Sequence, residues 1–271
     1  MPNKKAIIVV SFGTANDEIR TLCIESVENK IRCNFPEYEV KRAFTSYFII
    51  KKLSERNIYV DTLSQALEKL KVEGVQEVII QSTHLTPGEE YANKVIAVAN
   101  EYKDVFKMLS IGRPALMFDG SDHTSDDFSI AVQAVKTQIQ CNAADTEVVF
   151  MGHGSPHQHN PAFERLQKKL DEARENITIG VLEESDYPNI KDVLARLARK
   201  QNLKKVLLMP FLLVTGNHVA HDMNGEHESS WKNKIANAGY IVEVYLHGLG
   251  ENSAMQDIYV QHIKDVIVTK T

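Results

Sequence analysis

The stretch Val148-Val-Phe-Met-Gly-His-Gly154 is an apolar run that ends in a histidine between two glycines. A short apolar run followed by glycine is typical of a buried β-strand and the tight turn at its end. The first half of the chain carries a run of the same kind, residues 6–10, which ends in Ser11-Phe-Gly-Thr14. The two halves are therefore predicted to repeat one plan.

Eight such apolar runs alternate with helical patterns along the 271 residues. They are residues 6–10, 40–44, 78–81, 108–111, 148–151, 177–182, 206–209 and 241–245. Strands that alternate with helices indicate βαβ units, which form parallel sheets through right-handed crossovers. The sequence thus predicts an α/β protein of two similar domains, each with a parallel sheet flanked by helices and related by an internal pseudo-repeat.

A polar stretch, Asp119–Asp127, separates the two sets of four runs and predicts the domain connection. We place the N-terminal domain at residues 1–125 and the C-terminal domain at residues 126–271. The last apolar pattern includes Ile258 and Ile263 and predicts a C-terminal helix. Its sequence is compatible with packing on either domain.

Two helices of the second half have recognisable N-terminal signals. Asn160-Pro161 predicts a capping side chain followed by a proline at the first helical position. Asn189 is predicted to cap a second amphipathic helix that ends near Asn202.

The composition excludes several classes of protein. Hydrophobic residues make up 43% and charged residues 25% of the chain, which is typical of a folded globular protein. The net charge of -5 argues against a general nucleic-acid-binding protein, because phosphate backbones select for clustered positive charge. All apolar runs are strand-sized, and no signal peptide is predicted. We therefore expect neither nucleic acid nor a membrane among the partners.

The three cysteines are Cys23, Cys33 and Cys141, which are scattered and show no CxxC spacing. This pattern fits a reducing compartment and argues against a zinc site built from thiolates. We expect a cytoplasmic protein.

Three potential metal ligands follow three successive predicted strands of the second half: His153, Glu183 and His218. Because parallel strands present their carboxyl ends on one edge of a sheet, all three are expected on the same rim, with the other domain closing a cleft over them. Two imidazoles and a carboxylate suit Co²⁺, Ni²⁺, Fe²⁺ or Zn²⁺. Each residue alone also fits a polar group beside a turn, so the prediction depends on the shared rim.

The first half ends its strands mostly in small or neutral groups, but Glu90 follows a turn in Thr86-Pro-Gly-Glu-Glu-Tyr91. Glu90 either takes part in the same chemistry or complements the dipole of the helix that begins there. The chain has no GxGxxG motif after a strand and no P-loop, HExxH or GxSxG motif. Dinucleotide and ATP chemistry are therefore not expected.

Short blocks spread along the chain carry a specific family pattern. They are Val9-Val-Ser-Phe-Gly-Thr14, Arg42-Ala-Phe-Thr-Ser46, Gln81-Ser-Thr-His84, Gly88-Glu-Glu-Tyr91, Val149-Phe-Met-Gly-His-Gly154, Leu208-Met-Pro210, Gly216-Asn-His218, Asp222-Met223, Ser230-Trp-Lys232 and Gly248-Leu-Gly-Glu-Asn252. Together, and in this order, they resemble the sirohydrochlorin cobaltochelatases of anaerobic cobalamin biosynthesis (the CbiK family of class II chelatases). The similarity extends from about Lys4 to Val266.

The resemblance implies a chelatase-like fold of two similar α/β domains around a tetrapyrrole cleft. The implied activity is ATP-independent insertion of Co²⁺ into sirohydrochlorin or precorrin-2. No organic cofactor is implied, because Co²⁺ is the substrate metal and the tetrapyrrole is the other substrate. A homo-oligomer is left open.

Carried over by position, His153, Glu183 and His218 match the metal-binding residues of the family, and His153 also matches its proposed proton acceptor. Glu90 matches the acidic residue implicated opposite them. This chain has extra residues before Tyr187-Pro188, which leaves Glu184 open as a replacement for Glu183, although counting from His153 favours Glu183.

The tetrapyrrole substrate carries many carboxylates, which basic side chains at the rim would bind. Arg113, just after the fourth predicted strand, is the candidate for this role. We also expect Ser11, Thr14 and His84 to contact the substrate.

Other functions remain open at this point. A ferrochelatase or nickel chelatase would use the same ligands, because the choice of metal depends on geometry and supply as much as on ligand type. A non-catalytic haem or metal carrier would bind without turnover. A metallohydrolase would require an open metal site with an activated water molecule.

Overall fold

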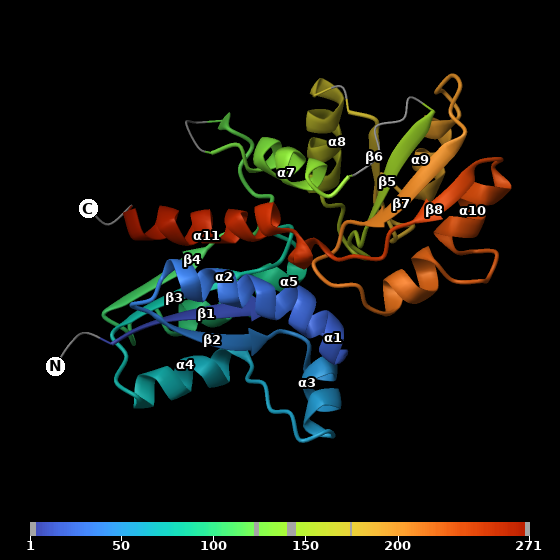
Figure 1. The fold of residues 1–271 in the computed structure, drawn as a ribbon. Helices are drawn as coiled ribbons and strands as arrows, with labels where there is room; N and C mark the ends of the chain where they lie inside the picture. The colour runs from blue at the N-terminus through green and yellow to red at the C-terminus, as the bar shows by residue number, and fades with distance from the viewer. Residues whose placement is uncertain (1–3, 122–124, 140–144, 174, 269–271) are drawn as a thin grey trace. The chain divides into compact units, whose positions relative to one another are not determined.

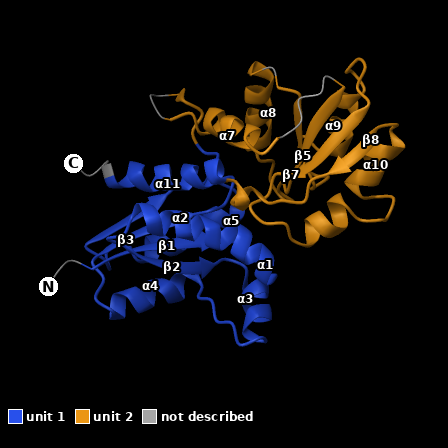
Figure 2. Ribbon diagram, viewed as in Figure 1, with its two compact units in different colours: residues 1–117, 253–271 blue, residues 118–252 orange. Residues whose placement is uncertain are grey.

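The computed structural model describes residues 4–121, 125–139, 145–173 and 175–268. His123 and Cys141 lie outside these residues. The chain divides into two compact units, residues 1–117 with 253–271 and residues 118–252 (Figure 2). The boundary predicted from the sequence lies at residue 125, and the sequence is compatible with packing of the C-terminal helix on either domain.

The first unit is built on a parallel sheet of four strands (Figure 1). The strands are β1 (Lys5–Ser11), β2 (Glu39–Phe44), β3 (Glu77–Ser82) and β4 (Met108–Gly112), in the order β2-β1-β3-β4. Ile7 of β1 pairs with Val40 of β2 and with Ile79 of β3, which sets the register of the central strands. All four predicted apolar runs of this half form strands.

Helices cover both faces of this sheet (Figure 1). The helices described in this unit are α1 (Asp17–Ile19), the π-helix η1 (Arg20–Glu25), α2 (Ser26–Asn34), α3 (Tyr47–Ser54), α4 (Leu63–Val72), α5 (Glu89–Tyr91), the π-helix η2 (Ala92–Ile96), α6 (Ala97–Glu101) and α11 (Ser253–Val268). Ala6, Ile8 and Val10 of β1 form one hydrophobic core with residues of α4 and of the segment α5 to α6. Ile7 and Val9 point to the opposite face, because successive side chains of a strand alternate.

The C-terminal helix α11 packs on the first unit, against α2, β3 and β4. Met255, Tyr259 and Ile263 of α11 are fully buried. The Tyr259 hydroxyl donates a hydrogen bond of 2.9 Å to the Thr83 carbonyl oxygen, just beyond β3. Burial of this apolar face decides which unit receives the helix.

The second unit repeats the same topology. Its parallel strands are β5 (Thr146–Gly152), β6 (Ile177–Val181), β7 (Lys205–Pro210) and β8 (Ile241–Val244), in the order β6-β5-β7-β8. Its helices are α7 (Asp127–Lys136), α8 (Ala162–Glu172), α9 (Ile190–Leu197), the π-helix η4 (His218–Met223), α10 (Trp231–Asn237) and the 3-10 helix η5 (Leu249–Glu251). Val149 and Met151 of β5 form a core with residues of α9, η4 and α10. The predicted α/β fold of two similar parallel sheets is confirmed.

The ends of two helices test the predicted caps. The Asn189 side chain accepts a hydrogen bond from the Lys191 amide and forms a capping box with Asp192, so this cap is confirmed. The helix ends at Leu197 rather than near Asn202. In the other case α8 begins at Ala162, with Pro161 at the N-cap rather than at the first helical position.

Asn160 nevertheless acts at the start of α8. Its Oδ1 accepts a hydrogen bond of 3.1 Å from the Ala162 amide, so it satisfies one of the free amides of the first turn. No helix among the described residues is long and apolar enough to cross a membrane.

The repeat extends to individual backbone hydrogen bonds at the carboxyl ends of the strands. The amide of Ser46 donates to the carbonyl of Phe12 at 3.2 Å, and the amide of Glu183 donates to the carbonyl of His153 at 3.1 Å. Phe12 and Ser46 thus occupy the positions in the first unit that His153 and Glu183 occupy in the second.

A second pair of hydrogen bonds aligns the segments after β3 and β7. The Ala92 amide donates to the Gly88 carbonyl, and the Ala220 amide donates to the Gly216 carbonyl. Two residues beyond each glycine lie Glu90 in the first unit and His218 in the second. Glu90 is therefore the structural counterpart of His218.

Candidate metal-binding site

The three predicted metal ligands lie at the carboxyl ends of three neighbouring strands. His153 directly follows β5, Glu183 lies two residues after β6, and His218 is the first residue of η4, which follows β7. Since β5 lies between β6 and β7, the sheet order places His153 between the other two.

His153 contacts both of its neighbours. Its ring lies edge-on to the His218 ring, with 4.8 Å between centroids, and its Nδ1 lies 3.9 Å from Oε1 of Glu183. The side chains are partly exposed, from 29% for Glu183 to 49% for His218. Within the described part of the chain, no three His, Cys, Asp or Glu side chains are placed to hold one metal ion together.

The hydrogen bonds of the two histidines set which ring nitrogen is free. Nδ1 of His153 lies 3.1 Å from the Gly154 carbonyl oxygen, and Nδ1 of His218 lies 2.8 Å from Oδ2 of Asp222. A carbonyl or carboxylate oxygen only accepts, so Nδ1 carries the proton in each neutral ring. Both imidazoles therefore keep the Nε2 lone pair for a metal ion or a proton.

Asp222 orients His218 from one turn further along η4. Its other oxygen, Oδ1, lies 3.0 Å from Nδ1 of His221, so one carboxylate serves two imidazoles. Burial raises the pKa of Asp222, but the hydrogen bonds from His221 and His218 outweigh it and hold the pKa below its ordinary value. Asp222 is therefore an anion that fixes the orientation of the His218 ring.

The structure separates the two successive glutamates. Glu183 points toward His153, whereas the Glu184 side chain is 67% exposed and its carboxylate lies 3.7 Å from Nζ of Lys234. Only Glu183 lies beside a histidine of the predicted site.

This difference gives a first prediction. Glu183→Gln should weaken Co²⁺ binding by the substrate-free protein by at least about 10-fold, because the loss of even a group that only supports a ligand costs a metal site about 10- to 100-fold in affinity. Glu184→Gln should leave the affinity unchanged, because its carboxylate faces Lys234. Titration of both variants with Co²⁺, followed by its visible absorption, makes the comparison. A larger loss of Co²⁺ affinity in Glu184→Gln than in Glu183→Gln would identify Glu184 as the ligand.

The two glycines around His153 allow a close approach of neighbouring elements. A Cβ at Gly152 would lie 2.5 Å from the Phe163 ring, and a Cβ at Gly154 would lie 2.8 Å from Cβ of Val181. Gly154 also has a φ of +82°, which other residues rarely adopt. The Gly-His-Gly sequence is thus required by the turn that presents His153.

The residues of the first unit that were expected to bind substrate make hydrogen bonds or ion pairs with other residues of the protein. Ser11 is buried and accepts a hydrogen bond of 2.8 Å from the Thr83 hydroxyl, and buried Thr14 accepts one from the Asn16 amide. Arg113 forms an ion pair of 2.7 Å with Asp265 of α11, and its side chain is only 10% exposed. Arg113 therefore ties α11 to the first unit instead of presenting a cation to the substrate.

His84 is also turned into the protein. Its Nδ1 lies 2.8 Å from the Ser82 hydroxyl, and its buried Nε2 has no hydrogen-bond partner among the described residues. Burial lowers the pKa of His84 to about 4, so this ring is neutral at pH 7.

Glu90 lies in the first turn of α5 and makes no hydrogen bond or ion pair with any residue that the structure describes. Lys94 follows one turn later, at the position that Asp222 occupies in the second unit. The Glu90 carboxylate is thus free for chemistry, although its place in the first turn also suits the helix dipole.

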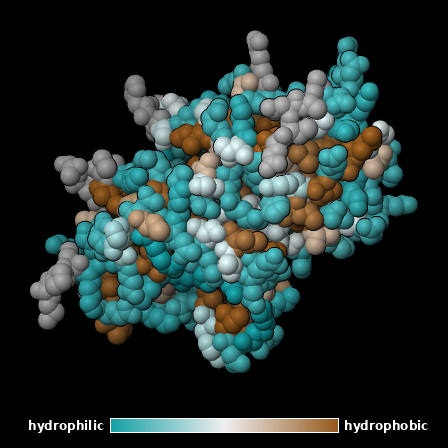
Figure 3. All heavy atoms as spheres, in the orientation of Figure 1, coloured by the Kyte–Doolittle hydropathy of each residue, from teal (hydrophilic) through white to brown (hydrophobic). Residues whose placement is uncertain are grey.

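Three aromatic side chains near these strand ends were not anticipated from the sequence. Phe12, Tyr47 and Phe48 are all more than half exposed. In the view of Figure 3, most of the surface is hydrophilic and the hydrophobic patches are small and separate. Lys94 and Lys52 each place Nζ 4.5 Å from an aromatic ring centroid, of Tyr47 and Phe48 respectively. For Phe12 the available signal was its position directly after a strand, whereas Tyr47 and Phe48 begin helix α3 and carry no such signal.

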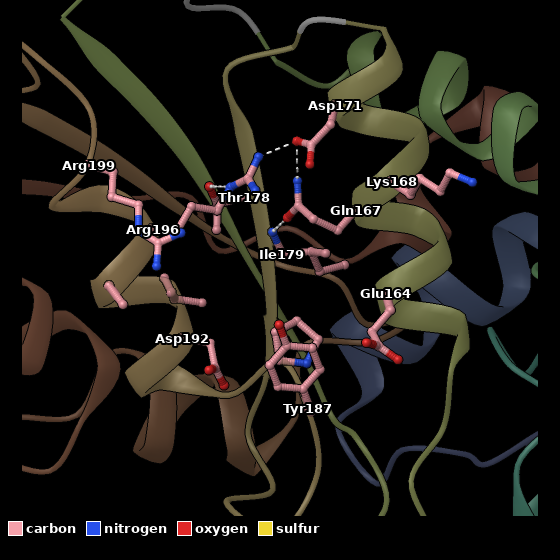
Figure 4. Close-up of a pocket in the computed structure, with 13 residues that line it drawn as sticks. Glu164, Gln167, Lys168, Asp171, Thr178, Ile179, Tyr187, Asp192, Arg196 and Arg199 are labelled. Atoms are coloured by element: carbon pink, nitrogen blue, oxygen red, sulfur yellow. Dashed lines mark hydrogen bonds and ion pairs between the residues drawn. The ribbon is translucent and has the colours of Figure 1, made fainter.

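A groove of about 380 Å³ opens between α8 and α9, over the edge strand β6 (Figure 4). Gln167 bonds to the backbone of Ile177 and Ile179, and Arg196 bonds to Thr178. The two bonds of Gln167 satisfy backbone groups at the open edge of β6, which protects this edge from pairing with another strand. None of the predicted metal ligands lines this groove.

Comparison with known proteins assigns the chain to a family. Residues 5–268 match the family described as cobalt chelatase (CbiK), which is nearly the whole chain. The chain belongs to the cobalt chelatase (CbiK) family. As a member of that family, it is 36% identical over 265 residues to the sirohydrochlorin cobaltochelatase of Salmonella typhimurium, with 97% of each chain covered.

A second relative of this CbiK-family chain is the sirohydrochlorin cobaltochelatase CbiKC of Nitratidesulfovibrio vulgaris. It is 29% identical over 262 residues, which cover 96% of this chain and 89% of that protein. The sequence-based assignment to the cobaltochelatases is confirmed, and the chain is a metal chelatase.

Two solved structures share the fold. SirB from Bacillus subtilis with Fe3+ has a TM-score of 0.65 at 16% identity and covers 97% of this chain and 95% of its own. CbiX, described as the terminal enzyme for biosynthesis of siroheme in denitrifying bacteria, has a TM-score of 0.52 at 17% identity and covers 96% and 99%. The predicted chelatase-like fold is confirmed.

Proposed function

We propose that this CbiK-family chain inserts Co²⁺ into sirohydrochlorin, without ATP, as a step of cobalamin biosynthesis. The observation that carries the proposal is the pair of partly exposed histidines at neighbouring strand ends, 4.8 Å apart, in a chain whose relatives are named sirohydrochlorin cobaltochelatases. Both rings have Nδ1 engaged and Nε2 free.

The reaction exchanges two protons for one metal ion. The two N–H groups of the macrocycle lose their protons as its four nitrogens take Co²⁺, so the protein must release the metal and accept protons. His153 helps to hold the metal and, once the metal has left, accepts a proton at Nε2, the ring nitrogen that its hydrogen bond to Gly154 leaves free. Glu183 and His218 present the metal, and imidazole with carboxylate ligands binds Co²⁺ weakly enough to release it.

Asp222 keeps the His218 ring in a fixed orientation while the metal leaves. A carboxylate behind the opposite ring nitrogen is the usual partner of a metal-binding histidine, and it selects the tautomer that binds metal through Nε2. Glu90 assists the removal of a macrocycle proton or the transit of the metal. Its position as the counterpart of His218 in the repeat supports this role.

The macrocycle is a large conjugated ring with carboxylates around it. The exposed aromatic side chains Phe12, Tyr47 and Phe48 suit its face, and the ammonium groups of Lys52 and Lys94 suit its carboxylates. We assign substrate binding on the first unit to these residues in place of Arg113. The aromatic rings supply contact area, and the lysines supply charge.

The experiment that tests the function is an anaerobic assay with purified protein and sirohydrochlorin, in which Co²⁺, Fe²⁺ and Ni²⁺ are supplied separately and insertion is followed by absorbance. ATP is omitted, and a protein-free reaction gives the spontaneous rate. We expect many turnovers per protein molecule, fastest with Co²⁺. Faster turnover with Fe²⁺ or Ni²⁺ would assign that ion as the substrate metal in place of Co²⁺. Binding of one equivalent of tetrapyrrole or metal without turnover would indicate a carrier.

The choice between two tetrapyrroles needs a parallel reaction. Precorrin-2 replaces sirohydrochlorin under the same conditions. We expect a higher kcat/KM for sirohydrochlorin, the substrate that the names of the two relatives give for those proteins.

A further inference from the structure

Asp186 is a buried carboxylate in the loop between β6 and α9. Its residue is only 3% exposed, although it carries a charged group. Charged groups are seldom buried unless several hydrogen bonds compensate for the loss of water. The partners of Asp186 therefore indicate what this charge holds in place.

The partners of Asp186 come mainly from the segment that follows His153. Oδ2 accepts a hydrogen bond of 2.8 Å from the amide of Ser155, and Oδ1 accepts one of 3.3 Å from the amide of Asn160. Nδ1 of His159 lies 2.7 Å from Oδ1. A single carboxylate thus joins both ends of the loop between β5 and α8.

This loop lacks regular secondary structure from His153 to Asn160. Backbone amides outside helices and strands need other acceptors, and Asp186 supplies them for two of the residues in the loop. The Asp186 amide in turn donates to the Glu183 carbonyl at 3.1 Å. Asp186 therefore links the loop of His153 to the turn that carries Glu183.

His159 reinforces the same contact. Its Nδ1 faces Asp186, and its Nε2 lies 2.8 Å from Oε2 of Glu164 in α8. Both ring nitrogens face carboxylate oxygens, so the imidazolium form donates to both. The hydrogen bonds with Asp186 and Glu164 raise the pKa of His159, which favours that form.

We propose that Asp186, assisted by His159, is a positioning residue of the metal site: it holds the loop after β5 in the conformation that presents His153 next to Glu183 and His218. This role rests on the proposed function of those three residues. Asp186 itself is buried under the loop, and its hydrogen-bond partners are groups of the protein. Its effect passes through the backbone of the loop and of the turn after β6.

The principal test is Asp186→Asn, which keeps the shape of the side chain and removes its charge. The amide group that replaces one carboxylate oxygen cannot accept from the backbone amides it faces. We expect the variant to bind Co²⁺ at least about tenfold more weakly than the wild-type protein, the lower end of the loss seen when supporting partners of metal sites are removed.

Glu147→Gln is the matched control for lost stability. Glu147 is a buried carboxylate at the opposite end of β5, where it accepts a hydrogen bond of 2.6 Å from the Thr178 hydroxyl and pairs with Lys200. Glu147→Gln should lower the thermal midpoint but leave Co²⁺ affinity unchanged. An equal loss of affinity in both variants would overturn the proposal, because general destabilisation would then explain it.

A milder pair of variants keeps the test decisive if Asp186→Asn does not fold. His159→Ala removes one partner of Asp186, whereas His157→Ala removes an exposed imidazole of the same loop that has no hydrogen bond among the described residues. His159→Ala should weaken Co²⁺ binding and His157→Ala should not. Equal affinities for both variants and the wild-type protein would overturn the positioning role.

The same titrations distinguish this inference from the proposed function. Wild-type protein that fails to bind Co²⁺ or to insert it would refute the proposed function. Wild-type protein that binds Co²⁺ while Asp186→Asn and His159→Ala bind it equally well would refute only the positioning role.

Discussion

His153→Ala is expected to lower the turnover of Co²⁺ insertion by about 10²- to 10⁴-fold, the usual cost of removing a proton-transfer group. The substitution removes the proton acceptor and one metal ligand together. The His153 side chain is 44% exposed, so its loss leaves no buried cavity and the fold should survive. Anaerobic turnover and the thermal midpoint of the purified variant check both parts of this expectation.

His218→Ala should reduce turnover in the same way. The substitution removes the second imidazole Nε2 that can bind the metal, and it leaves Oδ2 of Asp222 without its histidine partner. His157→Ala is the control for both variants, because it removes an imidazole from the exposed part of the loop after His153. Turnover at the wild-type rate in either His153→Ala or His218→Ala would exclude that residue from the mechanism.

Glu90→Gln is expected to lower turnover by about 10²-fold while Co²⁺ affinity of the substrate-free protein stays nearly unchanged. The reason is that Glu90 lies on the first unit, at the counterpart of the His218 position, and is not among the residues that present the metal. Measurements of turnover, Co²⁺ affinity and thermal midpoint on the one variant separate a catalytic from a structural role.

Glu89→Gln provides the matched control. Glu89 is the other acidic residue in the first turn of α5, so it interacts with the helix dipole in the same way. If Glu90 only complements the dipole, both variants should lose about 0.3 to 1 kcal/mol of stability and retain ordinary catalysis. Equal turnover in the two variants would make Glu90 a structural residue.

Local sequence patterns were sufficient to predict where the eight strands lie along the chain. A parallel strand inside the sheet must be apolar on both faces, so the central strands leave short continuous apolar runs such as Val148–Met151, whereas the edge strand β2 includes Lys41 and Arg42. The rule that parallel strands end on one edge of a sheet then predicts that His153, Glu183 and His218 lie on one rim. The cap at Asn189 followed from local chemistry in the same way.

The substrate-contacting residues were harder to predict, because exposure and side-chain partners depend on residues distant in the chain. Arg113 is separated from Asp265 by 152 residues, and only the packing of α11 on the first unit brings them together. Sequence patterns assign a cation to the rim but do not show that a carboxylate from the C-terminal helix neutralises it.

The α/β class, the repeat, the family and the three candidate ligands follow from local patterns in the chain, because periodicity and short motifs are local properties. The three-dimensional fold was needed to show that Glu183 rather than Glu184 faces His153, that Glu90 is the counterpart of His218, and that α11 belongs to the first unit. Each of these depends on hydrogen bonds and burial between segments far apart in the chain. Asp186 shows the same principle. Its burial is explained by the hydrogen bonds that it accepts from the loop folded over it, and these partners are distant from it in the sequence.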